Sequence, residues 1–291
     1  MDGAHVSVVI ITRDRLRSLL TTLTRLDALP ERPDVVLVDQ GSQDGTPAAV
    51  RRGFPHVRVL ELEHDRGAAG RTVGARVVRT PYVAFCDDDS WWAPGALSRA
   101  AALLDAHPGL GGIAGRVLLG PEGRLDPACA AMATSPLAGD LPGPRVLGFV
   151  ACGAIVRRAP YLAVGGFDPR LRIGGEEQLL ATDLAARGWP LVYRHDVVAF
   201  HHPSALRDRA ARRAMQVRND LWFAWLRRHR GHVVRVTGAA LRAAAGERAA
   251  RAGLVRAVAG APGVLGQRRP VPDWLERDFR ALDRTRVTRS G

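Results

Sequence analysis

The sequence predicts an α/β fold with a mostly parallel, doubly wound sheet and a helical C-terminal extension. Short apolar runs typical of buried strands alternate with segments whose apolar residues recur at helical spacing. Alternation of this kind favours a parallel sheet, because parallel neighbours need a crossover helix between them. From about residue 205 the pattern becomes continuously helical and rich in Arg and Ala.

Each element is predicted from its own pattern. The first helix has leucines at helical spacing, and the helix after the fourth strand begins near Pro94, a favoured first helical position. Residues 120–144 are rich in Gly, Pro and Ala and predict a long loop. The expected helices of the first half cover residues 13–26, 46–52 and 70–79. The expected strands cover residues 6–11, 35–39, 57–62, 82–86, 148–156 and 191–200.

Three consecutive aspartates, Asp87, Asp88 and Asp89, follow the strand expected at 82–86. The carboxyl ends of strands are where open α/β sheets bind ligands. Carboxylates this close repel one another unless a cation joins them, and oxygen ligands suit Mg²⁺ or Mn²⁺. The alternative is a solvated acidic turn in which Asp89 or Ser90 caps the next helix.

Four stretches in order resemble the family 2 glycosyltransferases of the GT-A fold: residues 6–13, 35–46, 85–89 with an Asp-x-Asp motif, and 165–189. The resemblance covers about residues 6–204. It implies a Rossmann-like GT-A catalytic domain over 1–204, with a nucleotide-binding half to about 118 and an acceptor half over 119–204. Residues 205–291 would form a separate basic helical region. The implied reaction is metal-dependent, inverting transfer of a hexosyl or deoxyhexosyl group from a nucleoside diphosphate to an acceptor hydroxyl.

The resemblance also implies a donor site. Asp39 matches an aspartate that accepts a hydrogen bond from the ring N–H of the nucleotide base; the alternative is a turn or cap residue in the loop that follows. Arg71 lies among small residues before a helix, where phosphate can approach the backbone, or it is a surface arginine. The family's Ala-Arg-Asn is Gly70-Arg71-Thr72 here, so its Asn is missing. The full set of donor-binding residues is Thr12, Arg13, Asp39, Arg71, Asp87 and Asp88.

The metal site implied by the resemblance consists of Asp89 and His201, holding Mg²⁺ or Mn²⁺ against the two donor phosphates, while Asp87 contacts the ribose side. Adjacent strand residues point to opposite faces, so only one of His201 and His202 can face the site. Family spacing from Asp196 selects His201. The alternative is that both histidines simply lie at the surface.

For the acceptor side, the resemblance places Glu177 at the general-base position, because Glu176-Glu177 precedes Gly188 at the family's spacing. The family has Glu-Asp there, so the base here is one methylene longer. The alternative is two acids in the first turn of a helix, which the helix dipole favours. The expected acceptor-binding residues are Trp91, Trp92, Asp168 and Glu176, although tryptophans are also ordinary core residues.

Composition excludes several classes of enzyme. All 42 basic residues are Arg, so Schiff-base chemistry and Walker-type phosphate loops, which need Lys, are excluded. The three cysteines are few and far apart, and no zinc spacing occurs, which indicates a reducing cytoplasm. We also expect no signal peptide, and no apolar stretch reaches the roughly 18 residues of a membrane span.

The net charge of +13 comes from the last third of the chain. Residues 1–200 have 22 Arg and 22 acidic residues, whereas residues 201–291 have 20 Arg and 7 acidic residues. These arginines surround Trp222, Phe223 and Trp225. Such a surface suits peripheral contact with the anionic inner face of a membrane; the alternative is that the aromatic face packs on the catalytic domain.

The expected partners are a UDP, dTDP or GDP sugar and an acceptor that is a glycan, a lipid-linked sugar or a small molecule. The Gln-x-x-Arg-Trp motif of processive synthases is absent, which favours a nonprocessive enzyme. Two other functions were weighed. A sugar-nucleotide pyrophosphorylase would need a Gly-rich N-terminal loop and a catalytic Lys, and neither is present. An Arg-rich nucleic-acid-binding protein fits the charge of the C-terminal region but not the balanced first 200 residues or the acidic triplet.

Overall fold

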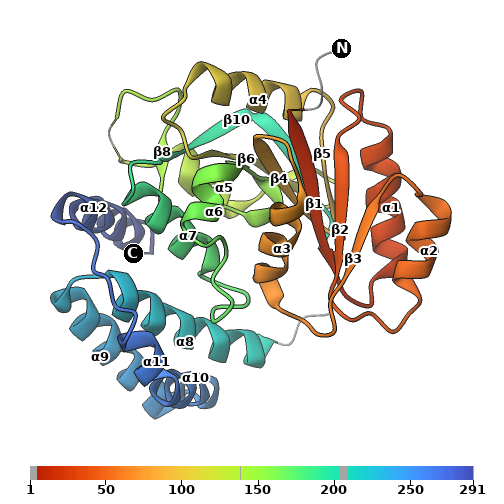
Figure 1. Cartoon of the computed structure of the whole chain (residues 1–291). Helices are drawn as coiled ribbons and strands as arrows, with labels where there is room; N and C mark the ends of the chain where they lie inside the picture. The colour runs from red at the N-terminus through yellow and green to blue at the C-terminus, as the bar shows by residue number, and fades with distance from the viewer. Residues whose placement is uncertain (1–4, 138, 204–208, 291) are drawn as a thin grey trace.

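The structure is a computed structural model that describes residues 5–137, 139–203 and 209–290. It confirms the α/β fold class, with helices on both faces of one twisted sheet and a helical part at the C-terminal end (Figure 1). The strands of the described residues are β1 (Val6–Thr12), β2 (Asp34–Asp39), β3 (Arg58–Glu61), β4 (Tyr82–Asp87), β5 (Ser90–Trp92), β6 (Gly112–Leu119), β7 (Arg124–Leu125), β8 (Arg145–Val146), β9 (Ala154–Arg157) and β10 (Leu191–His201).

The sheet is parallel in its first half and mixed in its second. Its order is β3-β2-β1-β4-β9-β6-β10-β5, and β3, β2, β1 and β4 all run parallel. Strand β9 lies antiparallel between β4 and β6. The register pairs Thr12 with Asp39 across β1 and β2, and Ile11 with Asp87 across β1 and β4. The carboxyl ends of three neighbouring strands therefore meet at one edge.

Alternating side chains of the strands point into two hydrophobic cores, one on each face of the sheet. Val8 and Ile10 of β1 face one core, and Val9 between them faces the other, as the period of two in a strand requires. The helices that cover the first face are α1 (Leu16–Asp27), α2 (Thr46–Gly53) and α4 (Ala96–Ala106). The helices on the second face are α3 (Gly70–Val77), α5 (Pro127–Ala133), α6 (Arg158–Ala163) and α7 (Glu176–Ala185).

The segment expected to be one long loop contains structure. Residues 120–144 include β7 and α5, and α5 begins because the Asp126 carboxylate accepts from Ala128 N at 2.7 Å while Pro127 stands at the first helical position. Strand β6, for which no prediction was made, lies near the centre of the sheet. Ser90 belongs to β5 and does not cap a helix, and α4 starts only after Gly95, whose φ is +79°.

The C-terminal region forms a helical bundle with its own core. Its helices are α8 (Arg209–Arg227), α9 (Arg230–Gly246), α10 (Arg248–Ala259), α11 (Ala261–Leu265) and α12 (Asp273–Ser290). Trp222, Phe223 and Trp225 are at most 9% exposed and pack with Leu179 of α7 and with the other C-terminal helices. The structure thus corrects the expectation that these rings face a membrane, because a buried ring has no surface to offer. Arg207 and the boundary expected at 204/205 lie outside the described residues.

Ion pairs join this bundle to the rest of the chain. Arg227 of α8 holds Asp183 of α7 through contacts of 2.5 and 2.9 Å, and Arg145 of β8 holds Asp278 of α12 at 2.6 Å. Within the described residues, no helix combines the length and the apolar character that crossing a membrane requires. In Figure 1 the bundle lies against α7, below the sheet.

Candidate active site

Asp39 ends β2 with one carboxylate oxygen satisfied and one left over. Its side chain is 2% exposed, and Oδ2 accepts from the Ser42 amide at 2.9 Å. Oδ1 is buried and has no hydrogen-bond partner in the described part of the chain. A buried acceptor without a donor is costly, so this oxygen is placed to accept an N–H from a ligand. The turn role weighed for Asp39 is also present, through Ser42.

Arg71 and Asp87 form a pair at the centre of the edge. Arg71 is 5% exposed and donates from Nη2 to Asp87 Oδ1, and its guanidinium lies 5.6 Å from the ring centre of Phe167. Burial lowers the pKa of Arg71, but the charges of Asp87, Glu177 and Glu176 outweigh burial and raise it. Arg71 is therefore a fixed cation inside the site, and the surface interpretation is excluded by its burial.

Asp88 faces away from Asp87 and is held by the start of the chain. Its Oδ2 accepts from Thr12 Oγ1 at 3.0 Å, and its carbonyl accepts from Thr22 Oγ1 at 3.0 Å. Burial raises the pKa of Asp88 to about 7, and the neighbouring Asp89 adds to the rise. Thr12 thus orients the triplet, and its hydroxyl is engaged inside the protein.

Asp89 and His201 meet where β4 and β10 end. His201 Nε2 lies 3.2 Å from Asp89 Oδ1, and both side chains are largely buried. The Asp87 carboxylate, the His201 imidazole and the Cys152 thiol each bring one atom within 4.8 Å of the others. Burial raises the pKa of the Cys152 thiol well above its usual range, so this sulfur stays protonated and is a poor ligand. The remaining donors, carboxylate oxygens with one imidazole, match Mn²⁺ or Mg²⁺.

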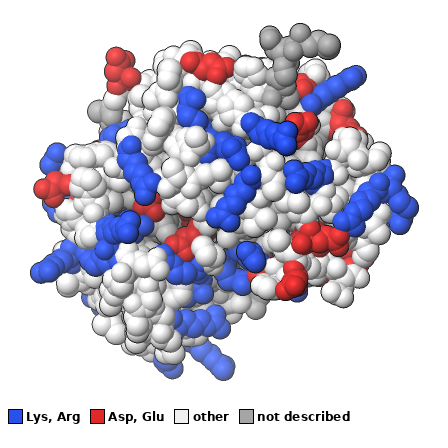
Figure 2. All heavy atoms as spheres, in the orientation of Figure 1, with Lys and Arg blue, Asp and Glu red and all other residues white. Residues whose placement is uncertain are grey.

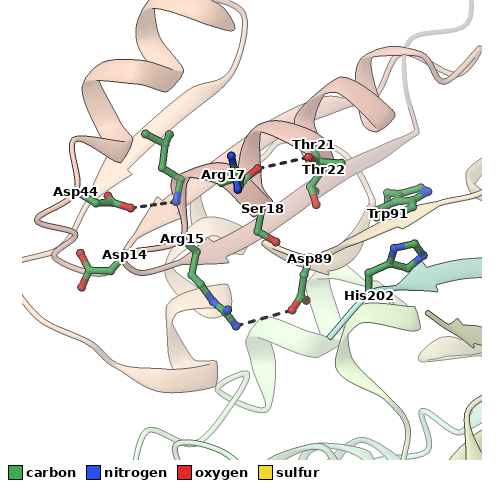
Figure 3. A pocket seen from close by; sticks show the side chains of 11 residues that line it. Asp14, Arg15, Arg17, Ser18, Thr21, Thr22, Asp44, Asp89, Trp91 and His202 are labelled. Atoms are coloured by element: carbon green, nitrogen blue, oxygen red, sulfur yellow. Dashed lines mark hydrogen bonds and ion pairs between the residues drawn. The ribbon is translucent and has the colours of Figure 1, made fainter. Parts of the chain in front are cut away.

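A cavity of about 540 Å³ opens between the start of α1 and the triplet. Figure 3 shows Arg15, the residue before α1, reaching toward Asp89, with Trp91 and His202 on the opposite wall. The Arg15 guanidinium lies 3.7 Å from Asp88 and 3.9 Å from Asp89. His202 packs edge-on against Trp91, with ring centres 4.7 Å apart. Of the histidine pair, His201 thus points to the triplet and His202 to this cavity.

Trp91 and Trp92 lie on opposite sides of β5. Trp91 is half-buried and lines the cavity, whereas Trp92 is 0% exposed within the first core. A ring with no exposed surface cannot stack on an acceptor. The acceptor role expected of Trp92 is therefore wrong, and the period of two along the strand is the reason.

Glu176 and Glu177 open α7 on the other side of Arg71. Burial raises the pKa of Glu176 to about 8, and the charge of Glu177 adds to the rise. Burial also raises the pKa of Glu177, against the charge of Arg71. Burial therefore favours a protonated carboxyl in this pair. Glu177 lines a cavity of about 370 Å³, and Glu176 does not.

Two of the expected residues lie apart from this cluster. Arg13 is half exposed and lies 3.7 Å from Asp14 and 3.8 Å from Asp65. Asp168 accepts from Arg170 Nε at 2.9 Å and lines a different cavity from the one that Glu177 lines.

The sequence analysis missed residues that the structure brings to the site. Arg15 was overlooked, although a cation two residues after Arg13 could have been suspected beside three carboxylates. Asn219 of α8 reaches the loop before Glu176, and no sequence signal could have found it, because the contact joins segments more than 40 residues apart.

Comparisons with known proteins identify the family of the chain. The family model for glycosyl transferase family 2 matches residues 7–164. An N-acetylglucosaminyl-diphospho-decaprenol L-rhamnosyltransferase of Mycobacterium tuberculosis (strain ATCC 25618 / H37Rv) is 29% identical over 235 residues, which cover 67% of this chain and 75% of that protein. The succinoglycan biosynthesis protein ExoU of Rhizobium meliloti (strain 1021) is 28% identical over 169 residues, covering 56% and 46%.

Solved structures share the fold. A mannosyltransferase of Pyrobaculum calidifontis, PcManGT in complex with GDP-Man and Mn²⁺, superposes with a TM-score of 0.56 at 22% identity, covering 90% of this chain and 72% of that one. S. aureus TarS 1–349 in complex with UDP-GlcNAc gives 0.58 at 18% identity, covering 87% and 71%.

The fold and the strand-edge site together define a GT-A glycosyltransferase. The chain belongs to glycosyl transferase family 2, because the family model matches more than half of its length.

Proposed function

We propose that the protein is a metal-dependent, inverting, nonprocessive glycosyltransferase that moves a hexosyl or deoxyhexosyl group from a nucleoside diphosphate to an acceptor hydroxyl. The observation that carries the proposal is the gathering of Asp39, Arg71 and Asp87–Asp89 at one strand edge, with Glu177 across from them. Asp39 offers a free buried acceptor for a base N–H. Arg71 offers a desolvated cation for phosphate.

The donor set fits a nucleoside diphosphate in three parts. Asp39 Oδ1 accepts from the base, and Asp87 accepts from the ribose while Arg71 holds it in place. Arg71 and Arg15 supply positive charge to the diphosphate, and Arg13 lies at the rim. Asp88, held by Thr12, orients its two neighbours.

The metal donors proposed are Asp89 and His201, with the Asp87 carboxylate close enough to join them. Such a set fits Mn²⁺ or Mg²⁺, the ions that carboxylates and imidazole accept. When bound, the ion neutralises the charge that grows on the leaving diphosphate. The GT-A fold gives the Asp-x-Asp residues this position at the end of β4.

The acceptor hydroxyl gives its proton to Glu177. Burial raises the pKa of Glu177 toward the working pH, which suits a general base. Glu176, its neighbour in the first turn of α7, is proposed to meet the acceptor beside the base. The hydroxyl oxygen attacks C1 on the face opposite the leaving diphosphate, so the C1–O bond to the donor breaks as the new bond forms and the anomeric configuration inverts. Trp91 and Asp168 are proposed to meet more distant parts of the acceptor.

The donor base is proposed to be that of UDP, dTDP or GDP, and the acceptor a lipid-linked sugar. The support is the mycobacterial relative, whose name gives a diphospho-decaprenol acceptor and a rhamnosyl product. Cytoplasmic location, at the inner face of the membrane, follows from that acceptor and from three buried thiols that form no disulfide.

Peripheral membrane contact is proposed through the outer surface of α9 and α10. Val234 and Leu241 are 72% and 56% exposed, and Val255 and Val258 of α10 are 63% and 59% exposed. Figure 2 shows Arg side chains around a pale surface at the lower left, where these helices lie. Exposed apolar residues within a basic surface suit an anionic bilayer.

A thermal-shift panel tests the proposed function. UDP, GDP, dTDP and CDP are each added with and without Mn²⁺, and a ligand that binds only the folded protein raises the melting temperature by mass action. We expect one nucleotide to give the largest shift and the shift to need the metal. Equal melting temperatures in all conditions would refute nucleotide binding.

A further inference from the structure

The loop before α7 has three residues with positive φ: Arg172, Gly174 and Gly175, at +57°, +90° and +95°. Glycine adopts such values freely, but Arg172 keeps a left-handed conformation only where its surroundings hold it. Glu176 and Glu177 come directly after this loop, so its position sets where the general base stands.

The donor half holds one side of the loop. Ala68 N donates to Arg172 O at 2.8 Å, and Arg172 Nη2 lies 2.6 Å from Asp65 Oδ2. A Cβ at Gly67 would lie 2.7 Å from Arg172 O, so glycine is needed there for the two segments to touch.

Helix α8 of the C-terminal region holds the other side. Asn219 is 0% exposed, and its Nδ2 lies 2.9 Å from Leu171 O and 3.0 Å from Ile173 O, and also contacts Gly174 O. Arg218 donates to Leu171 O at 3.2 Å and to the side-chain oxygen Oδ1 of Asn219 at 2.8 Å. In Figure 1 this loop lies between α7 and α8. The side chains of α8 thus occupy carbonyls that no helix or strand satisfies.

The same helix lines the cavity that Glu177 faces. Gln216 and Asp220 stand one turn apart on α8, joined by a bond of 2.7 Å from Gln216 Nε2 to Asp220 Oδ1, and both line the cavity. Other polar side chains of the lining are Glu177 and Gln178 of α7, Thr134, Ser135, Asp283 and Thr285. Its apolar side chains include Met132, Leu147, Phe149, Phe279 and Leu282. A lining that mixes polar and apolar side chains suits a sugar ring, which has hydroxyls at its edge and C–H groups on its face.

We infer that α8 is part of the acceptor site: Asn219 is a positioning residue for Glu177, and Gln216 and Asp220 bind hydroxyls of an acceptor sugar in the 370 Å³ cavity. The inference rests on the proposed function. It implies that the C-terminal bundle completes the catalytic unit and is not a separable extension.

The test separates positioning from recognition by using two reactions. Hydrolysis of the donor needs Glu177 to activate water but needs no acceptor, whereas transfer needs both. The acceptor probe is N-acetylglucosaminyl diphosphate on a short alkyl chain. The donor is a nucleotide sugar that carries the nucleoside diphosphate with the largest thermal shift. The variants are Asn219→Ala, Gln216→Ala and Asp220→Asn, with Arg212→Ala as control, because Arg212 lies one turn before Gln216 on α8 and outside the cavity lining.

Asn219→Ala should lower kcat of both hydrolysis and transfer on the order of 10²-fold, as a misplaced reacting group does, with nucleotide affinity and donor KM unchanged. Gln216→Ala and Asp220→Asn should raise the acceptor KM about tenfold and leave hydrolysis unchanged, and Arg212→Ala should match the wild type. If Asn219→Ala lowers the melting temperature but keeps the hydrolysis kcat of the folded fraction, the positioning role is overturned.

Two further outcomes keep the inference distinct from the proposed function. Wild-type protein that hydrolyses the donor but does not transfer to the probe overturns the sugar acceptor in this cavity. Protein that binds no nucleotide and hydrolyses no donor overturns the proposed function itself. If Asn219→Ala does not fold, Arg172→Ala, which cuts the loop's contact with Asp65 at an exposed position, must reproduce the loss of kcat or the positioning role is overturned.

Discussion

The donor side and the acceptor side of the site are built in different ways. On the donor side, Thr12, Asp39 and Asp87 stand at the ends of three neighbouring parallel strands, and the register alone brings them together. On the acceptor side, Glu177 follows a loop that is held by Asp65–Ala69 on one flank and by Asn219 on the other. The donor side is rigid because the sheet is rigid. The acceptor side depends on contacts between segments far apart in the chain.

This difference also separates the charges. The donor edge gathers carboxylates with Arg71 and Arg15 between them, so an added cation or diphosphate changes its balance strongly. The acceptor cavity combines apolar side chains with the acidic side chains of Glu177, Asp220 and Asp283. Changes on the donor side should therefore abolish binding, and changes on the acceptor side should alter rates.

The largest effect is expected on the donor side, from Asp89→Ala. The substitution removes a proposed metal ligand next to His201, so the metal-dependent part of the nucleotide thermal shift should vanish while the metal-free melting temperature stays close to wild type. Asp34→Ala, an exposed carboxylate at the other end of β2, is the control. An undiminished nucleotide thermal shift in Asp89→Ala, or in wild-type protein with EDTA, would contradict the assignment of Asp89 as a metal ligand.

On the acceptor side, Glu177→Gln should keep nucleotide binding and lower the transfer rate roughly 10²- to 10⁴-fold, the usual contribution of a positioned base. Glu176→Gln should lower it less, because Glu177 lines the acceptor cavity and Glu176 does not. Steady-state kinetics with saturating donor measure both. A larger loss in Glu176→Gln would mean that the two roles are exchanged.

A third prediction concerns the bundle that supports the acceptor side. Arg228 and Glu276 are 2% and 3% exposed and lie 3.0 Å apart. Arg228→Met removes the cation that holds the buried carboxylate of Glu276 and that of Asp283, and among the described residues leaves Glu276 only Arg280 at 3.7 Å and the His229 amide at 3.3 Å. This loss should lower the free energy of unfolding by about 3 kcal/mol in urea titrations. The control is Arg213→Met, whose Arg–Glu pair has the same 3.0 Å separation but is nearly half exposed and should contribute at most about 1 kcal/mol. Equal losses in the two variants would contradict this account.

The fourth prediction uses the shared proton of the glutamate pair. In the folded protein the pKa of Glu176 is about 8, above the ordinary 4.5. Between these values the folded protein holds a proton that the unfolded chain has lost, so the free energy of unfolding falls as pH rises from about 5 to about 8. Glu176→Gln removes the carboxyl that causes this fall. The melting temperature of the variant should therefore decrease less between pH 5 and pH 8 than that of the wild type. Glu122→Gln, an exposed glutamate, should leave the wild-type pH dependence as it is; a Glu176→Gln profile parallel to the wild type would refute the raised pKa.

The smallest effect is expected at the membrane surface. Each Arg near an anionic bilayer contributes on the order of 1 kcal/mol at most, screened within a Debye length, so co-sedimentation with anionic vesicles should be reversible and fall with salt. The double substitution Val234→Asp and Leu241→Asp should weaken vesicle binding further, because it replaces two exposed apolar side chains that are proposed to enter the bilayer. Trp222→Phe, a buried substitution, is the control. Sedimentation that is equal with neutral and anionic vesicles at low salt would remove the membrane proposal.

The sequence by itself determined the α/β class, most of the elements to within a few residues and the family. Local patterns carry this information, because a strand's apolar run and the carboxylate that follows it are adjacent in the chain. The same locality limited the prediction. The motif of residues 85–89 could not reveal that Trp91 lines a cavity and Trp92 faces the core, since that depends on which face of β5 the first core covers. Helix α5 was missed because its cap, Asp126, stands in a stretch of Gly and Pro.

Only the tertiary structure decided what lies across from the triplet. Arg15 reaches Asp88 and Asp89 from the residue before α1, and Asn219 reaches the loop before Glu177 from the C-terminal bundle. The aromatic face of α8, for which the sequence left a membrane and the catalytic domain as alternatives, became part of a core. These outcomes depend on which segments pack together. Packing depends on the summed burial of many side chains that are distant in the sequence. Short local patterns therefore do not predict it.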